Sequence, residues 1–253
     1  MLNILLISNT NNFVIKNELL NFVNENLKKD KSLNFTLNEL NDEHAYEWIL
    51  SNSIHVNTLK LIKSKFKSLP LDINFFKSNK IRKKKLLIAD LDSTMIKEES
   101  IDEIGKLANI EKKMMNITYE AMSGKLKFDD AIVQRVALLR NLPKDKILDL
   151  RNNLTLSHGS ISLIKSMNAN DAHTTIVSGG FKPIVKFIAK KLEVKSCYYN
   201  EFIYKNDKKN KLVISGKIKK PILNETSKLD ILLKYKKKFN LNDEDIIAIG
   251  DGA

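Results

Sequence analysis

Apolar and polar residues alternate in short blocks along the first 78 residues of the chain. Runs with a two-residue period predict strands, and runs with a period near 3.6 residues predict helices. The pattern gives the order strand, helix, two short strands, helix and strand, at residues 2–7, 13–27, around Phe35 and Tyr46, 56–66 and 72–76. We therefore expect a mixed α+β unit in this part of the chain.

From residue 86 the pattern changes to that of a parallel sheet. Apolar or β-branched runs at residues 86–89, 173–177 and 245–249 are each followed by acidic or glycine-containing turns. Strands of this kind are typical of a doubly wound, Rossmann-like α/β core, which holds ligand groups at the carboxyl ends of its strands.

Three further segments complete the predicted organisation. A basic stretch at residues 79–85 is expected to link the first unit, residues 1–78, to the second, residues 86–253. Helical patterns fill residues 98–155. Two β-like runs, at residues 201–204 and 211–215, are expected to form a hairpin because a polar turn separates them.

Two carboxylates follow the first strand of the second unit, in the sequence Asp90-Leu91-Asp92-Ser93-Thr94. One carboxylate at a strand end can attack phosphorus, and a second can protonate the leaving oxygen and later take a proton from water. We expect Asp90 to be the nucleophile and Asp92 the acid and base. On this motif alone, acidic residues in a solvated loop are the alternative.

A second motif, Ser178-Gly179-Gly180, follows the strand at residues 173–177, and a helical pattern begins at residue 181. Glycines allow a close backbone approach, and a helix N-terminus favours a phosphate. Ser178 is therefore a candidate phosphate ligand. A plain strand-to-helix turn is the alternative.

Lys228 and Asp251 extend the candidate chemistry. Lys228 opens a helical pattern after Asn224, where a lysine can neutralise a phosphoryl oxygen, although a solvated lysine is the local alternative. Asp251 follows the strand at residues 245–249, in the sequence G-D-G-A. A carboxylate at this edge suits Mg²⁺, which binds a few carboxylates together with water and phosphate.

Taken in order, D-L-D-S-T, S-G-G-F, the lysine and G-D-G-A resemble the four motifs of haloacid-dehalogenase-like phosphatases, in the version found in phosphoserine phosphatases. The resemblance runs from about residue 84 to the end of the chain. It implies hydrolysis of O-phospho-L-serine to L-serine and phosphate, the last step of L-serine biosynthesis, through an aspartyl-phosphate on Asp90. It also implies that residues 98–155 form a small helical cap.

The resemblance extends into that cap. Carried over residue by residue, Glu99 would bind the substrate ammonium and Arg135 its carboxylate, while Met122 and Phe128 would close over it. The residue types agree with this, because an amino acid presents one cation and one anion and a guanidinium pairs with a carboxylate at two points. Exposed charges and ordinary core packing are the alternatives for these side chains.

The resemblance also implies a metal site and a phosphate site. Mg²⁺ would be held by the Asp90 carboxylate, the Asp92 backbone carbonyl and Asp251. The groups that would bind the phosphoryl oxygens are Ser93, Ser178, Gly179, Gly180 and Lys228. In the family, G-D-G-A is followed by Asn and Asp and by further strands and helices, so the resemblance implies a core that is incomplete at its carboxyl end.

Composition narrows the remaining classes. The chain has 253 residues, 43% of them hydrophobic, which is enough for more than one compact unit. No run approaches the ~18 apolar residues of a membrane span, and the first strand lacks the flanks of a signal peptide. The single cysteine, Cys197, cannot form an intrachain disulfide, so we expect a cytoplasmic protein.

The net charge of +13 raises the question of a nucleic-acid partner. The basic residues form scattered runs without interleaved aromatic repeats or a recognisable binding module. We interpret the charge as solvated surface that mildly attracts an anionic substrate, and expect neither a nucleic-acid nor a membrane partner. The four histidines lack the paired spacing of a zinc site.

The order of elements in residues 1–78 is ferredoxin-like. Amino-terminal extensions of bacterial phosphoserine phosphatases are often ACT-like, a related small-molecule-binding topology, so the resemblance implies a regulatory domain. No ligand motif stands out in this segment, and an oligomer contact, such as that of a homodimer, or a degenerate remnant without a role are the alternatives. Three other functions stay open for the chain: a phosphatase or phosphotransferase of the same superfamily for another small phosphometabolite, a non-catalytic regulatory protein, and a nucleic-acid binder.

Overall fold

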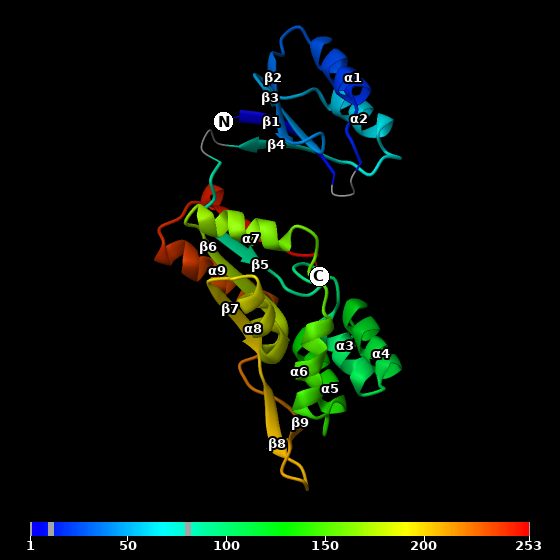
Figure 1. Cartoon of the computed structure of the whole chain (residues 1–253), viewed down its shortest axis with the longest axis vertical. Helices are drawn as coiled ribbons and strands as arrows, with labels where there is room; N and C mark the ends of the chain where they lie inside the picture. The colour runs from blue at the N-terminus through cyan, green and yellow to red at the C-terminus, as the bar shows by residue number, and fades with distance from the viewer. Residues whose placement is uncertain (1, 10–12, 79–81, 253) are drawn as a thin grey trace. The chain divides into compact units, whose positions relative to one another are not determined.

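The computed structural model describes residues 2–9, 13–78 and 82–252 and divides the chain into two compact units, Met1–Arg82 and Lys83–Ala253 (Figure 1). Each unit has a hydrophobic core of its own. Within the described residues, no helix is long and apolar enough to cross a membrane.

The first unit is a four-stranded antiparallel sheet with two helices. Its elements are β1 (Leu2–Ser8), α1 (Asn17–Lys28), β2 (Phe35–Asn41), β3 (Ala45–Leu50), α2 (Val56–Lys65) and β4 (Asp72–Ser78). The strand order is β2-β3-β1-β4. Leu5 of β1 lies opposite Trp48 of β3, and both are fully buried in a core with Val23, Leu27 and Ile62 of the helices. The two-residue period of the strands therefore points one face of the sheet at the helices.

Helix α1 begins four residues later than the sequence pattern predicts. Residues 13–16 are not helical, because the amide of Ile15 donates to the carbonyl oxygen of Glu43 at 2.8 Å. The Ile15 side chain is buried in the core of the unit. The apolar residues that suggested a longer helix are thus used by an extended segment.

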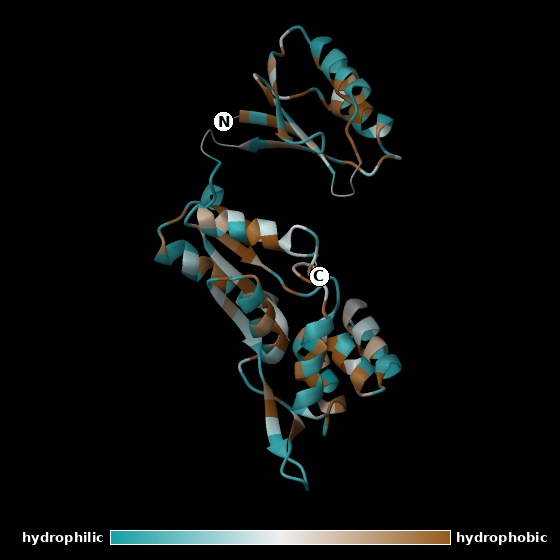
Figure 2. Cartoon of the chain, in the orientation of Figure 1, coloured by the Kyte–Doolittle hydropathy of each residue, from teal (hydrophilic) through white to brown (hydrophobic). Residues whose placement is uncertain are grey.

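The second unit is built on a parallel sheet, as the sequence predicts. The sheet contains β5 (Leu86–Ala89), β6 (His173–Phe181), β7 (Ser196–Asn200) and β10 (Ile246–Ile249) in the order β10-β5-β6-β7. Figure 2 shows β5 as apolar along its length, which agrees with a strand covered on both faces. The α/β core expected from the sequence is confirmed.

Helices cover both faces of this sheet. Leu87 and Ala89 face a core shared with α7 (Ser160–Ala169) and α8 (Lys182–Lys191), whereas Leu86 packs on the other face with Tyr235 of α9 (Glu225–Lys238). Alternate residues of one strand point to opposite faces, so a single apolar strand supplies both cores.

Four helices between β5 and α7 form a compact cap, visible in Figure 1 as a cluster beside the sheet. They are α3 (Ser100–Leu107), α4 (Glu111–Met122), α5 (Phe128–Leu138) and α6 (Lys144–Leu150), followed by the short turn η1 (Arg151–Asn153). The predicted hairpin is also present, as β8 (Phe202–Asn206) and β9 (Leu212–Ile218). It is tied to the cap, because Asn141 donates its amide to Ile214 at 2.8 Å and Ile214 donates to Leu142 at 2.9 Å.

The register of the sheet brings the predicted motifs to one edge. Ala89, the last residue of β5, lies beside Ile249 of β10 and Ile176 of β6. The residues that follow each of these positions therefore leave the sheet together. Strand β6 continues to Phe181 with an irregular register after Val177, so the glycines of the second motif lie within the strand's distorted end.

Candidate active site

Asp90 lies directly after β5, and its backbone and side chain are both fixed. The amide of Asp90 donates to the Ile249 carbonyl at 3.0 Å, and the amide of Leu91 donates to Oδ1 of Asp90 at 2.8 Å. The second carboxylate oxygen, Oδ2, accepts a hydrogen bond from Nζ of Lys228. The first motif and the predicted lysine therefore meet in an ion pair whose carboxylate side chain is 14% exposed.

The start of α9 positions Lys228. Asn224 is the N-cap: its side chain accepts from the amide of Ser227 at 3.2 Å, and the hydroxyl of Ser227 accepts from the Asn224 amide at 3.3 Å. This reciprocal capping box fixes where the helix begins. Lys228 therefore lies in the first turn of α9, directed at the strand edge.

Asp92 is the buried acid of the arrangement. The amide of Ser100 donates to Asp92 Oδ1 at 3.0 Å. Burial raises the pKa of Asp92 to about 7, and the nearby charges of Glu99 and Asp90 act in the same direction against the hydrogen bonding from Ser100. A carboxyl group with a pKa near neutrality can both give and take a proton, which is what a general acid and base requires.

The second motif packs against Asp92. A Cβ atom on Gly180 would lie 3.0 Å from Asp92 Oδ2, 3.0 Å from Ser178 Oγ and 3.2 Å from Ser100 Oγ, so glycine allows this close approach. Ser178 is fully buried, and its Oγ accepts from the amide of Gly180 at 2.9 Å. The first and second motifs are therefore in direct contact, as their order along the sheet predicts.

Asp251 joins Asp90 and Lys228 around a cavity of about 350 Å³. The cavity lies at the carboxyl ends of β5 and β10, and strand residues such as Ala89 and Ile249 form its apolar part. One lysine and two aspartates therefore line the same small cavity at the edge of the sheet.

The donor set at this edge is suitable for Mg²⁺. Within the described part of the chain, no three His, Cys, Asp or Glu side chains are arranged to hold a metal ion. Mg²⁺, however, usually takes one or two protein carboxylates and completes its shell with waters and substrate phosphate. Asp90 and Asp251 supply two carboxylates beside one cavity, so the residues present fit that ion.

The cap contacts the second motif through the first residues of α5. The ring of Phe128 lies over Gly179, since a Cβ on that glycine would be 3.1 Å from Phe128 Cζ. Next to it, Asp129 Oδ1 accepts from Nδ2 of Asn224 at 3.1 Å. The beginning of α5 thus reaches both the second motif and the start of α9.

Glu99 and Arg135 lie near each other on the cap side. Glu99 accepts from the Ser93 hydroxyl at 2.6 Å, and burial, together with the charges of Asp102, Asp251 and Asp90, raises its pKa. Burial lowers the pKa of Arg135, while the charges of Asp102 and Glu99 oppose that change.

The guanidinium of Arg135 is incompletely partnered. Its Nε is buried and has no hydrogen-bond partner among the described residues.

The side chain of Met122 lies outside what the structure describes. The structure therefore brings together eight of the predicted residues through direct contacts or one cavity (Asp90, Asp92, Ser93, Glu99, Ser178, Gly180, Lys228 and Asp251) and sets Phe128 on Gly179.

One residue at this edge was not predicted from the sequence. Asn200, at the end of β7, is buried and donates from Nδ2 to the carbonyl oxygens of Gly179 at 2.8 Å and Leu223 at 3.2 Å, while its Oδ1 accepts from the Leu223 amide at 2.8 Å. It therefore ties the second motif to the segment before α9. The only signal in the sequence is an asparagine that ends a short polar strand.

A family model described as haloacid dehalogenase-like hydrolase matches residues 87–253. The chain belongs to this family. A curated relative, phosphoserine phosphatase of Methanocaldococcus jannaschii, is 37% identical over 172 residues, which are 68% of this chain and 79% of that protein. The residues matched by the family model include the parallel sheet and the helices between β5 and α7, and none of the first unit.

Two solved structures are also similar to this chain. A phospho-aspartyl intermediate analogue of phosphoserine phosphatase is 37% identical, covers 67% of this chain and 79% of its own, and superposes with a TM-score of 0.59. A HAD family hydrolase, t0658 from Salmonella enterica subsp. enterica serovar Typhi, covers 100% of this chain and 84% of its own with a TM-score of 0.79 at 24% identity. The second likeness concerns the fold alone.

Proposed function

We propose that this chain hydrolyses O-phospho-L-serine to L-serine and phosphate. The observation that carries the proposal is the meeting of a strand-end carboxylate paired with a lysine, Asp90 and Lys228, with a buried acid, Asp92, against a glycine-containing loop. Similarity to phosphoserine phosphatases at 37% identity over about two thirds of the chain supports the choice of substrate. Such an enzyme would catalyse the last step of L-serine biosynthesis.

The proposed reaction consists of two displacements at one carboxylate. Asp90 attacks the phosphorus of the substrate and forms an aspartyl phosphate, while the protonated Asp92 gives its proton to the departing serine oxygen. Asp92, now ionised, takes a proton from water, and that water attacks the aspartyl phosphate and restores Asp90. A pKa of about 7 for Asp92 suits both roles at neutral pH.

Charge on the phosphoryl group is balanced by groups at the same edge. Lys228 lies beside the proposed nucleophile, and Ser178, Gly179 and Gly180 form the distorted end of β6, where Gly180 packs against Asp92. Ser93 is the remaining candidate. Fixed donors of this kind stabilise the charge that develops in transfer without having to reorganise.

Mg²⁺ is the proposed cofactor. Asp90, Asp251 and the backbone carbonyl of Asp92 would hold it, and the bound ion would neutralise phosphoryl charge next to the nucleophile. The two carboxylates that line the cavity support this assignment.

The cap is proposed to recognise the amino-acid part of the substrate. Arg135, whose Nε has no partner among the described residues, would bind the carboxylate, and Glu99 would bind the ammonium. Phe128, over Gly179, and Met122 would enclose the substrate. The nearness of a partly buried cation, Arg135, to a partly buried acid, Glu99, supports this pairing.

The first unit is proposed to be an ACT-like or ferredoxin-like domain, residues 1–78, followed by a linker. Its strand order, β2-β3-β1-β4 with helices after β1 and β3, supports that topology. Regulation by a small molecule or contact in a homodimer are its proposed roles, and a single cysteine supports a cytoplasmic location.

The test is phosphate release from a panel of phosphomonoesters at equal concentration with Mg²⁺. The panel contains O-phospho-L-serine, O-phospho-L-threonine, phosphoethanolamine, glycerol 3-phosphate and an aryl phosphate. We expect kcat/KM to be highest for O-phospho-L-serine and to fall when either its carboxylate or its ammonium is absent. A higher kcat/KM for glycerol 3-phosphate would move the chain to another phosphatase of the family, and no turnover of any ester would leave it without catalytic function.

A further inference from the structure

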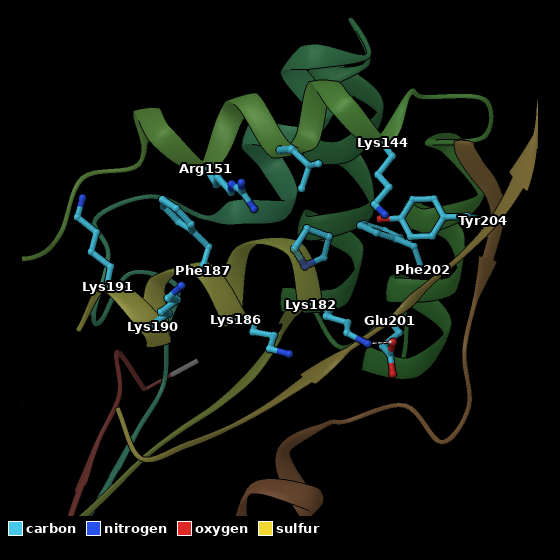
Figure 3. A pocket seen from close by; sticks show the side chains of 12 residues that line it. Lys144, Arg151, Lys182, Lys186, Phe187, Lys190, Lys191, Glu201, Phe202 and Tyr204 are labelled. Carbon is cyan, nitrogen blue, oxygen red and sulfur yellow. Dashed lines mark hydrogen bonds and ion pairs between the residues drawn. The ribbon is translucent and has the colours of Figure 1, made fainter. Parts of the chain in front are cut away.

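A second cavity, of about 880 Å³, lies between α6, η1, α8 and β8 (Figure 3). Its volume is typical of a small-molecule site, for which ~300–1,000 Å³ is usual. Among the described residues, none lines both this cavity and the one at Asp90. This cavity is therefore distinct from the proposed active site.

The rim of this cavity is strongly basic. Six of the residues around it are cations: Lys144, Arg151, Lys182, Lys186, Lys190 and Lys191. The one acid, Glu201, is already paired with Lys182 at 2.7 Å and with Lys219 at 3.4 Å. Within the described ranges, the other five cations form no ion pair. The two acids of α6, Asp145 and Asp149, do not line the cavity.

The floor is aromatic and contains unsatisfied polar atoms. Arg151 lies over the ring of Phe187, with its Cζ 4.7 Å from the centroid, and Lys144 Nζ lies 5.5 Å from the centroid of Tyr204 (Figure 3). Arg151 Nε and the Tyr204 hydroxyl are buried without a hydrogen-bond partner among the described residues. Burial raises the pKa of Tyr204 to about 12, so its hydroxyl keeps the proton that it can donate. Buried polar groups of this kind are usually satisfied by a ligand or by water.

The cations are spread along the cavity and do not converge on one point. Lys144 and Arg151 are seven residues apart on α6 and η1, and Lys182 and Lys190 are eight apart on α8, so the charged rims extend ~10–12 Å at 1.5 Å per residue. A single inorganic anion would contact few of these cations and would not use the rings. The arrangement is better suited to a ligand with several linked negative charges and a planar apolar group.

We propose that this cavity binds a nucleoside polyphosphate, with its phosphates along Lys186, Lys190 and Lys191 of α8 and its base on Tyr204, which lies at the other end of the cavity (Figure 3). Lysines and arginines are good ligands for phosphate oxygens, and an aromatic ring such as that of Tyr204 can stack on a base. The Tyr204 hydroxyl and Arg151 Nε would then gain partners. The inference does not depend on the substrate proposed for the active site.

The test is calorimetric titration of the full chain with ATP in EDTA, which prevents turnover. The cavity variant is Lys186→Ala/Lys190→Ala, and its matched control is Lys146→Ala/Lys165→Ala. All four lysines are exposed, and the control pair removes the same charge from α6 and α7 outside the cavity. We expect one saturable site, weakened roughly tenfold or more by the cavity variant and less than twofold by the control. Tyr204→Phe, which keeps the ring, is expected to weaken binding severalfold.

Tripolyphosphate and adenosine separate the two parts of the ligand. We expect tripolyphosphate to bind more weakly than ATP and adenosine to bind more weakly still. Equal affinity for ATP and tripolyphosphate, equal losses in the cavity and control variants, or no saturable ATP binding would each overturn the proposal. A glutamate-rich peptide that binds more tightly than ATP, with the same dependence on Lys186 and Lys190, would make the groove a protein-docking surface and overturn it as well.

Discussion

Asp92 is a carboxyl group whose surroundings oppose its ionised form. It is enclosed by Gly180, Ser178 and Ser100, and one amide hydrogen bond only partly offsets its loss of water. The difference between its ordinary pKa of 3.8 and about 7 corresponds to about 4 kcal/mol at ~1.36 kcal/mol per pKa unit. Above its pKa, the ionised form of Asp92 therefore lowers the free energy of unfolding, which is the cost of the proton-transfer role proposed for it.

Asp92→Asn is expected to stabilise the metal-free protein more at pH 8 than at pH 5. Folded Asp92 keeps its proton up to about pH 7, but the unfolded chain releases it near 3.8, so between these values the folded state binds more protons. The free energy of unfolding of the wild type therefore falls as pH rises through this window, and Asn removes that fall. The extra gain at pH 8 is about 2–3 kcal/mol, measurable by chemical denaturation in EDTA. An equal gain at both pH values would show that Asp92 is not a buried acid.

Arg135→Ala is expected to reduce turnover of phosphoserine and to leave an aryl phosphate almost unaffected. Only the amino-acid substrate has a carboxylate to lose, and a charged hydrogen bond of about 1.5–3 kcal/mol corresponds to roughly ten- to over a hundredfold in kcat/KM. Arg140→Ala, which removes the same charge from the exposed turn after α5, is the control. Equal losses on both substrates would assign Arg135 to folding or phosphate binding.

At the residue scale, the sequence predicts the groups that follow strands and misses those that act across the fold. Asp90 and Gly180 could be found because apolar runs end directly before their motifs. In the structure, Lys228 pairs with Asp90, and Asp92 packs against Gly180. Asn200 could not be found, because its partners, Gly179 and Leu223, are more than 20 residues away on either side.

At the element scale, the edge of the sheet is organised by the ends of its strands. The distorted end of β6, the end of β7 and the segment before α9 are joined through one side chain, Asn200. The capping box at Asn224 then sets the start of α9 and the position of Lys228. The distorted end of β6, which is proposed to bind phosphate, is therefore supported by a hydrogen-bonding group that does not line the cavity at Asp90.

Asn200→Ala is expected to lower kcat/KM equally on phosphoserine and on an aryl phosphate, because it disturbs the loop and not substrate recognition. It leaves part-buried backbone groups of Gly179 and Leu223 without these hydrogen bonds, at up to about 1–3 kcal/mol each. Asn168→Ala is the control, since Asn168 also bonds at both ends, to Glu193 and Thr174, but away from this edge. A selective loss on phosphoserine would place Asn200 among the recognition residues instead.

Element boundaries depend on contacts that the sequence pattern does not contain. The hairpin was predictable because a polar turn separates two apolar runs, and it appears as β8 and β9. Strand β7 was not predicted, because its residues are half-buried and mostly polar or aromatic, and its pairing with β6 is what makes it a strand. Helix α1 was predicted too long because Ile15 is used in an extended segment.

At the scale of the whole molecule, the chain consists of two units with separate cores. The change in hydrophobic pattern near residue 86 follows from the different sheets, antiparallel in the first unit and parallel in the second. Sequence patterns thus report the kind of sheet in each unit. The cavity between α6 and α8 depends on side chains from distant segments, and no local pattern contains it.

The two units are expected to unfold independently. The chain has one tryptophan, Trp48, which is fully buried in the first unit, so its fluorescence reports on that unit alone. Leu27→Ala, in the same core, is expected to destabilise the first unit by about 2–5 kcal/mol. The fluorescence midpoint in urea then moves to lower concentration while the midpoint of phosphatase activity stays unchanged. A matched shift of both midpoints would show that the units unfold as one.

The central claim is that Asp90 carries the phosphoryl group during turnover. Rapid-quench mass spectrometry of protein mixed with O-phospho-L-serine and Mg²⁺ tests it most directly. We expect a phosphoryl group on Asp90 that forms and decays at the rate of turnover, accumulates in Asp92→Asn because water is no longer activated, and is absent in Asp90→Asn together with activity. A phosphoryl group on another residue, or turnover by Asp90→Asn within tenfold of the wild type after deamidation is excluded, would contradict the account.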